Sequence, residues 1–145
     1  MAATLGMATL ACGMANANPI PLPDPALDEP LALIKTQKGV VLAGGCFWGV
    51  QAVFQHVKGV TRVLAGYAGG AASTAHYEMI GSGMTGHAES VLVTYDASQI
   101  TLGQIFKIFF SVAHDPTQVN RQGPDQGTQY RSAIFFASDE QKEIA

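Results

Sequence analysis

The stretch VVLAGGCFWGVQAVFQHVKG, residues 40–59, changes its hydrophobic period in the middle and thereby predicts a strand that leads into a helix. Residues 40–43 form a short apolar run, which is typical of a buried strand, and Gly44-Gly45 ends it. The apolar positions after the glycines recur at helical spacing: Phe47, Val50, Phe54 and Val57. Gly59 is placed to end this helix, and Cys46 is expected at its N-terminus.

Further strands and helices are predicted after residue 59. Strands are expected at residues 60–67, 88–95 and 132–136. Helix starts are indicated by Thr74, which would cap a short helix through Ile80, and by the capping boxes Thr101-x-x-Gln104 and Ser138-x-x-Gln141. This order predicts an α/β (α+β) fold: a two-layer sandwich with a mixed sheet and a split βαβ or ferredoxin-like core.

The length of 145 residues favours one domain, with distinct segments ahead of it. Residues 1–17 carry no charge and end in an A-x-A pattern, which predicts an export signal and a periplasmic or secreted protein; otherwise the protein is cytoplasmic. Residues 18–39 are rich in proline and predict a linker or surface arm. The folded domain is expected at 40–145, and its short last helix predicts that the natural C-terminus lies further on.

The composition argues against several classes of function. A net charge of −3 and a pI of about 5.7 give no reason to expect nucleic acid or an anionic membrane as a partner. Residues 1–17 are too short for a membrane span. The two cysteines, Cys12 and Cys46, have no zinc-ligand spacing, and we expect neither a metal nor a cofactor.

Cys46 is the strongest candidate for a reactive group. Unpaired N–H groups at a helix N-terminus and the helix dipole favour an anion, and the thiolate is the nucleophilic form of cysteine. A buried structural cysteine is the alternative, but the glycines around Cys46 leave space near its sulfur. Trp48 lies off the apolar stripe of the helix and is therefore available to line a pocket.

Several segments resemble the peptide-methionine sulfoxide reductase A family, in the order and spacing of that family. The segments are GCFWG at 45–49, GYAGG at 66–70, YE at 77–78, TGHAE at 85–89, HDPTQ at 114–118 and RQGPDQGTQYRS at 121–132. The similarity runs from about Val40 to the end of the chain.

The resemblance implies an enzyme that reduces the S epimer of methionine sulfoxide in proteins and peptides. Cys46 would attack the sulfoxide sulfur and become a sulfenic acid. Glu89 would protonate the sulfoxide oxygen, to which Tyr77 and Tyr130 would donate hydrogen bonds. No cofactor is implied.

The resemblance also implies a substrate pocket and a reducing partner. Phe47 and Trp48 would hold the methyl group of the substrate, and Asp125 would help to order the pocket. Many members carry a resolving cysteine near the C-terminus, whereas no cysteine follows Cys46 here. Either a cysteine in a further C-terminal segment resolves the sulfenic acid, or a partner thiol reduces it directly. The resemblance implies thioredoxin or a similar thiol as reductant, and we expect a monomer.

Two other functions remain open from the sequence. Cys46 could pair with His87 or His114, oriented by Asp115, in a cysteine hydrolase, which would require an imidazole within hydrogen-bonding distance of the sulfur. The chain could also be a non-catalytic module that binds methionine.

Overall fold

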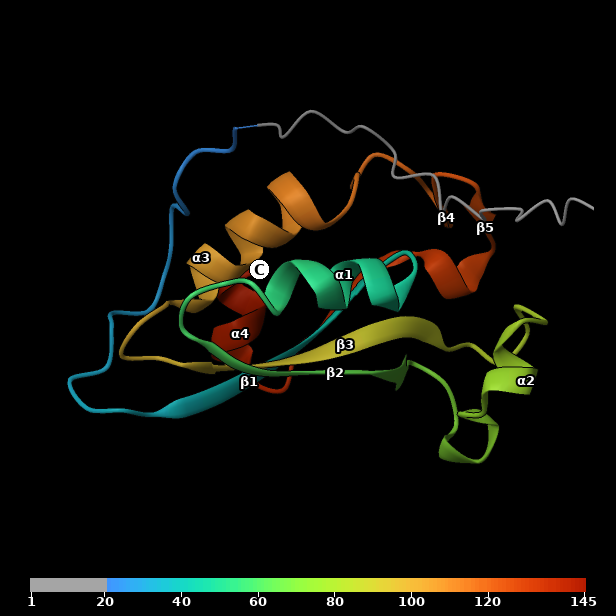
Figure 1. The fold of residues 1–145 in the computed structure, drawn as a ribbon, viewed down its shortest axis with the longest axis horizontal. Coiled ribbons are helices and arrows are strands. Elements are labelled where there is room, and N and C mark those ends of the chain that lie inside the picture. Colours follow the sequence, from blue (N-terminus) through green and yellow to red (C-terminus); the bar gives the residue numbers. More distant parts are fainter. Residues whose placement is uncertain (1–20) are drawn as a thin grey trace, which may run out of the picture.

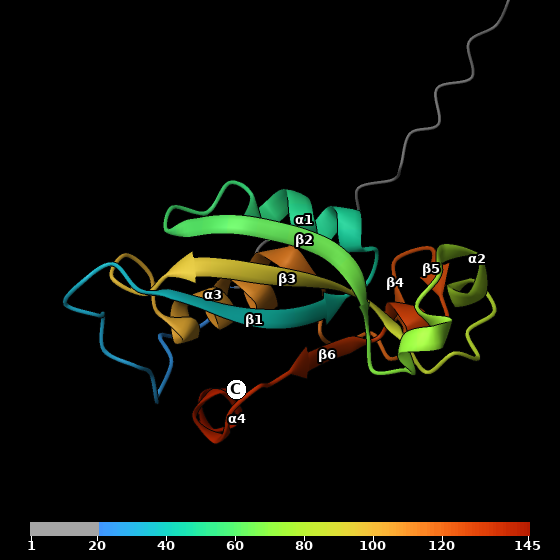
Figure 2. The same cartoon turned by 90° about the horizontal axis from the view of Figure 1, so that it is seen from below.

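The computed structural model describes residues 21–145, in which helices lie over one face of a four-stranded sheet (Figures 1 and 2). The strands are β1 (Gln37–Gly44), β2 (Val60–Ala68), β3 (Ala88–Asp96) and β6 (Ser132–Phe135), with a separate hairpin of β4 (Arg121–Gln122) and β5 (Asp125–Gln126). The helices are α1 (Phe47–Phe54), α2 (Tyr77–Ile80), α3 (Leu102–Ile108) and α4 (Asp139–Ile144). The predicted signal at 1–17 and Cys12 lie outside the described residues.

The strand order in the main sheet is β2-β3-β1-β6, and every neighbouring pair is antiparallel. The α/β class and the split βαβ core are confirmed, but the predicted mixed sheet is wrong. The α1 crossover makes β1 and β2 run in the same direction, as the prediction assumed. They form no parallel pair because β3 inserts between them and bonds to both.

The core lies between the sheet and the helices α1 and α3. Side chains alternate between the two faces of a strand, so every second residue points toward the helices. The most deeply buried large side chains include Tyr95, Phe54, Phe109, Leu42 and Leu102. The opposite face carries an in-register row of Leu64, Leu92, Val41 and Phe135.

Some of the helix starts and ends predicted from local sequence are present in the structure, and others are not. The capping box of Thr101 and Gln104 is present in full at the start of α3, as predicted. Thr74 does not cap α2, because its hydroxyl donates to the Ala71 carbonyl within its own turn at 2.9 Å. The helix α1 ends at Phe54, earlier than the apolar spacing predicts.

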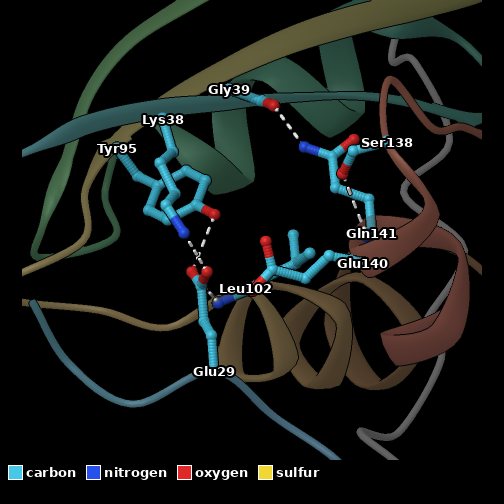
Figure 3. Close-up of a pocket in the computed structure, with 8 residues that line it drawn as sticks. All are labelled: Glu29, Lys38, Gly39, Tyr95, Leu102, Ser138, Glu140 and Gln141. Carbon is cyan, nitrogen blue, oxygen red and sulfur yellow. Dashed lines mark hydrogen bonds and ion pairs between the residues drawn. The ribbon is translucent and has the colours of Figure 1, made fainter.

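Residues of the proline-rich arm contact the start of α3 and the end of β3 (Figure 3). Glu29 is 7% exposed and accepts hydrogen bonds from the Tyr95 hydroxyl at 3.0 Å and from the Leu102 N–H at 3.3 Å. It also forms an ion pair with Lys38. Asp28 accepts from the Gly103 N–H at 2.8 Å, so both carboxylates meet the N-terminal turn of α3, where the helix dipole favours negative charge.

Within residues 21–145 there is no helix whose length and hydropathy would let it cross a membrane.

Candidate functional site

Cys46 lies between the end of β1 and the first residue of α1, at the position that the sequence predicts. It is the N-cap residue of α1 and is partly exposed. The turn before it requires a glycine. Gly45 has φ +90, and a Cβ at this position would lie 2.5 Å from the Gln122 side chain. The β4–β5 hairpin, which contains Gln122, therefore packs directly against the turn that presents the thiol.

Glu89 lies on the neighbouring strand β3 and is hydrogen-bonded to the start of α1. Its Oε2 accepts a hydrogen bond from the backbone N–H of Phe47 at 3.0 Å, and the residue is 7% exposed. Burial raises the pKa of this carboxyl above its ordinary value, the Phe47 N–H opposes that shift, and the charge of Asp125 adds to it. The net rise favours the protonated form. The fold thus holds a carboxyl with a raised proton affinity beside the residue that follows Cys46.

Tyr130 and Asp125 come from the segment that precedes β6. Tyr130 ends the 3₁₀ turn Thr128–Tyr130 and is half-buried. The pKa of its phenol is raised, first by burial and then by the charges of Glu89, Asp125, Cys46 and Tyr77. These groups are therefore close enough for their charges to act on the Tyr130 hydroxyl.

The remaining predicted residues differ in exposure. Trp48 and Tyr77 are 66% and 67% exposed, whereas Phe47 is 7% exposed and belongs to the core. The Phe47 ring centroid lies 6.0 Å from that of Trp48. In Figures 1 and 2 the start of α1, the hairpin β4–β5 and α2 lie at the same end of the sheet. The elements that carry the predicted residues thus lie at one end of the sheet. The Trp48 side chain is exposed to solvent there.

Tyr67 lies beside these residues, although no role for it was predicted from the sequence. It is the direct cross-strand partner of Glu89, and its ring centroid lies 5.7 Å from that of Phe47. Burial, followed by the charge of Glu89, raises the pKa of its phenol. The motif at 66–70 could have drawn attention to it, but its position opposite Glu89 depends on the strand register.

Both candidate histidines are bound to other groups, which contradicts the Cys/His pair. His87 accepts from the Gly70 N–H at 3.2 Å through Nδ1 and contacts the Ala71 carbonyl at 2.9 Å through Nε2. His114 contacts the Phe109 carbonyl and the Ser132 hydroxyl through its two ring nitrogens, and burial lowers its pKa. With both imidazoles occupied, neither is available to activate the Cys46 thiol.

Among residues 21–145, no three His, Cys, Asp or Glu side chains are arranged to hold a metal ion. The Cys46 thiol, the Glu89 carboxyl and the Tyr130 phenol lie at this end of the sheet. Such a set offers a nucleophile, a proton donor and hydrogen-bond donors.

Comparison with known proteins gives one consistent family. The family model described as peptide methionine sulfoxide reductase matches residues 38–145. Peptide methionine sulfoxide reductase MsrA 2 of Mesorhizobium japonicum is 64% identical over 105 residues, which cover 72% of this chain and 54% of that protein. The protein of the same name from Synechocystis is 54% identical over 127 residues, which cover 86% of this chain and 59% of that protein.

Solved structures agree with the sequence relatives. Methionine sulfoxide reductase A of Corynebacterium diphtheriae superposes with a TM-score of 0.66 and 37% identity, over 74% of this chain and 54% of that one. Reduced Mxr1 of Saccharomyces cerevisiae superposes with a TM-score of 0.69 and 36% identity, over 79% of this chain and 69% of that one. The chain spans only 54% and 59% of the two sequence relatives.

Proposed function

The chain belongs to the peptide methionine sulfoxide reductase family, and we propose from this that it reduces the S epimer of methionine sulfoxide in proteins and peptides. The observation that carries the proposal is the contact between Glu89 and α1. A buried carboxyl with a raised pKa is bonded to the Phe47 N–H, one residue after the thiol of Cys46. This contact supports a reaction in which Cys46 is the nucleophile and Glu89 the proton donor at the same turn.

In the proposed reaction the Cys46 thiolate bonds to the sulfoxide sulfur while Glu89 gives its proton to the sulfoxide oxygen. The protonated oxygen then passes from the substrate sulfur to the Cys46 sulfur, and the bond between the two sulfurs breaks. Methionine leaves, and Cys46 is a sulfenic acid. The oxygen gains basicity as the sulfur is attacked. Hydrogen bonds from Tyr77 and Tyr130 would therefore strengthen toward the transition state and lower the barrier.

The substrate would bind with its methyl group against Phe47 and Trp48. Sulfur-bearing side chains contact aromatic rings favourably. The 66% exposure of Trp48 supports a site open enough to accept a methionine side chain that is still part of a protein. Asp125, whose charge acts on both Glu89 and Tyr130, would help to order the polar side of the pocket.

The sulfenic acid must be reduced before the next turnover. Its attack by a thiol of thioredoxin or a similar protein would form a mixed disulfide and release water, and a second thiol of that protein would then free Cys46. Export through residues 1–17 and a monomeric state are also part of the proposal. An exported protein would require a thiol reductant outside the cytoplasm.

The test is turnover of a racemic methionine sulfoxide peptide with dithiothreitol, followed by chiral chromatography. We expect the S epimer to be consumed and the R epimer to remain. The mirror epimer would place its oxygen against the aromatic side chains and leave the buried Glu89 donor unpaired, which costs about 1–3 kcal/mol. Similar consumption of both epimers would contradict the proposed pocket, and binding without turnover would favour a non-catalytic module.

A further inference from the structure

Arg131 joins the chain segments that precede two of the site residues. Its guanidinium donates to the Gly86 carbonyl at 2.9 Å and to the His87 carbonyl at 3.2 Å. It also donates to the Thr128 carbonyl at 2.8 Å. Gly86 and His87 immediately precede the start of β3, which carries Glu89, whereas Thr128 begins the turn that ends in Tyr130.

A third segment packs on the same guanidinium. Gly69 has φ +100, and a Cβ there would lie 2.8 Å from Nη2 of Arg131 and 3.1 Å from the Gly86 carbonyl oxygen. Gly69 follows the end of β2, the strand that carries Tyr67. The guanidinium is thus surrounded by the ends of β2 and β3 and by the 3₁₀ turn before β6.

The chemistry of these contacts requires an arginine. A guanidinium is planar and presents several N–H donors in a fixed fork, so it can bond to separate carbonyls at once. A lysine ammonium on a flexible stem cannot reproduce this geometry. Each bond that is lost would leave a carbonyl without its partner and the connected segment less firmly held.

We propose that Arg131 is a positioning residue, which fixes the distance between the Glu89 carboxyl and the Tyr130 hydroxyl across the substrate. This inference rests on the proposed reductase function. The guanidinium of Arg131 donates to the backbone carbonyls of Gly86, His87 and Thr128 and not to Cys46, Glu89 or a phenol, so Arg131 acts through the backbone. Its removal should leave the Glu89–Phe47 bond in place and loosen the opposite side of the pocket.

Arg131→Ala should therefore lower kcat more than it raises KM, because misplacement by about 1 Å can cost on the order of 100-fold in rate. Discrimination between the epimers should also fall. Arg131→Lys keeps the positive charge but lacks the planar set of N–H donors, so its kcat should be little higher than that of Arg131→Ala. Millimolar guanidinium chloride should restore part of the kcat of Arg131→Ala by filling the vacated space, whereas sodium chloride at the same concentration should not.

The matched control is Arg62→Ala, which removes an exposed arginine of β2. Circular dichroism and thermal melting would report the folded fraction of each variant. A folded Arg131→Ala with lowered kcat and guanidinium rescue would support the inference. Activity equal to that of Arg62→Ala, or a loss that follows the unfolded fraction without rescue, would overturn it. An inactive wild-type protein would overturn the proposed function and with it this role for Arg131.

Discussion

Glu89 is the residue at which the folding of this protein and its proposed chemistry have opposing requirements. Its carboxyl is buried and accepts a hydrogen bond from the Phe47 N–H. Burial favours the neutral acid, which is the form that can give a proton to a sulfoxide. At higher pH the same position confines a carboxylate that is poorly solvated, which destabilises the folded state.

Glu89→Gln should separate these two effects. Because the folded pKa lies above the ordinary value of 4.5, wild-type stability should fall as pH rises through the window between 4.5 and the folded value. Glutamine does not titrate. The variant should therefore melt higher than wild type at neutral pH, and this difference should shrink as pH falls through the same window toward 4.5. Its rate should fall roughly 10²- to 10⁴-fold, the usual contribution of a general acid.

Thermal melts at a series of pH values and kcat/KM for the S epimer are the measurements. For the wild type, kcat/KM should decline as pH rises through the pKa of Glu89, because the acid loses its proton. A melting difference that is the same at every pH would contradict the assignment of a raised pKa to this group.

Cys46→Ser should abolish reduction of the sulfoxide, because a serine hydroxyl is not ionised at neutral pH and cannot take up oxygen as a sulfenic acid. Cys12→Ser provides the control with the only other cysteine of the chain, and it should keep wild-type activity. Trapping of the sulfenic acid with dimedone after a single turnover should label the wild type and not Cys46→Ser. Labelling that depends on Cys12 would show that the nucleophile is assigned to the wrong residue.

Helices and strands could be predicted from the sequence where their starts and ends depend on residues a few positions apart. The strand–glycine–helix junction around Cys46 and the capping box of α3 follow from side chains near in sequence, and both were predicted. The insertion of β3 between β1 and β2 could not be predicted, because it depends on pairing across long connections. The pairing of β2 with β3 also places Tyr67 opposite Glu89. The same pairing brings together the chain segments that Arg131 contacts.

The turn after β2 gives a test of how closely the elements around the site are packed. A Cβ on Gly70 would lie 2.4 Å from the Thr85 carbonyl oxygen and 2.5 Å from a ring carbon of His87. The ring cannot move freely because both of its nitrogens are bonded. Gly70→Ala should therefore lower the free energy of unfolding by about 1–3 kcal/mol, the usual cost of overpacking. It should also lower kcat, since the displaced segment leads to Glu89.

Gly66→Ala is the matched control, because a Cβ at Gly66 would meet nothing within 4 Å. Urea denaturation gives the free energy of unfolding of both variants, and the sulfoxide assay gives kcat. Equal effects of the two substitutions would indicate that loss of glycine in general, and not the contact with His87, is responsible.

For the molecule as a whole, the contacts of the arm and the proposed site lie at opposite ends of the sheet. The arm meets the start of α3 at one end, and the site residues gather at the other (Figure 1). Asp28→Ala removes an acceptor for the N-terminal N–H groups of α3 and should lower the free energy of unfolding by about 0.5–2 kcal/mol, as loss of a helix cap does. The kcat should not change, because the hydrogen bonds from residues 21–36 to the rest of the fold go to α3, the start of β1 and the end of β3 and not to the site residues.

Asp24→Ala is the comparison within the same arm. Asp24 pairs with Lys107 at 2.7 Å, but its side chain is 92% exposed, and exposed ion pairs contribute little. Chemical denaturation should distinguish the two variants, with Asp24→Ala close to wild type. An equal loss of stability would mean that the arm is held by its charges in general and not by the contact of Asp28 with the helix terminus.

The split order of the strands also has a consequence for synthesis on the ribosome. Cys46 belongs to the first β-α unit, whereas Tyr130 and the edge strand β6 come from the far end of the chain. At roughly 5–20 residues per second, translation reaches Tyr130 on the order of 4–17 seconds after Cys46. During that interval the nascent polypeptide contains the thiol without the groups that surround it in the finished fold. An oxidant encountered in those seconds meets a thiol that the native pocket does not yet shield.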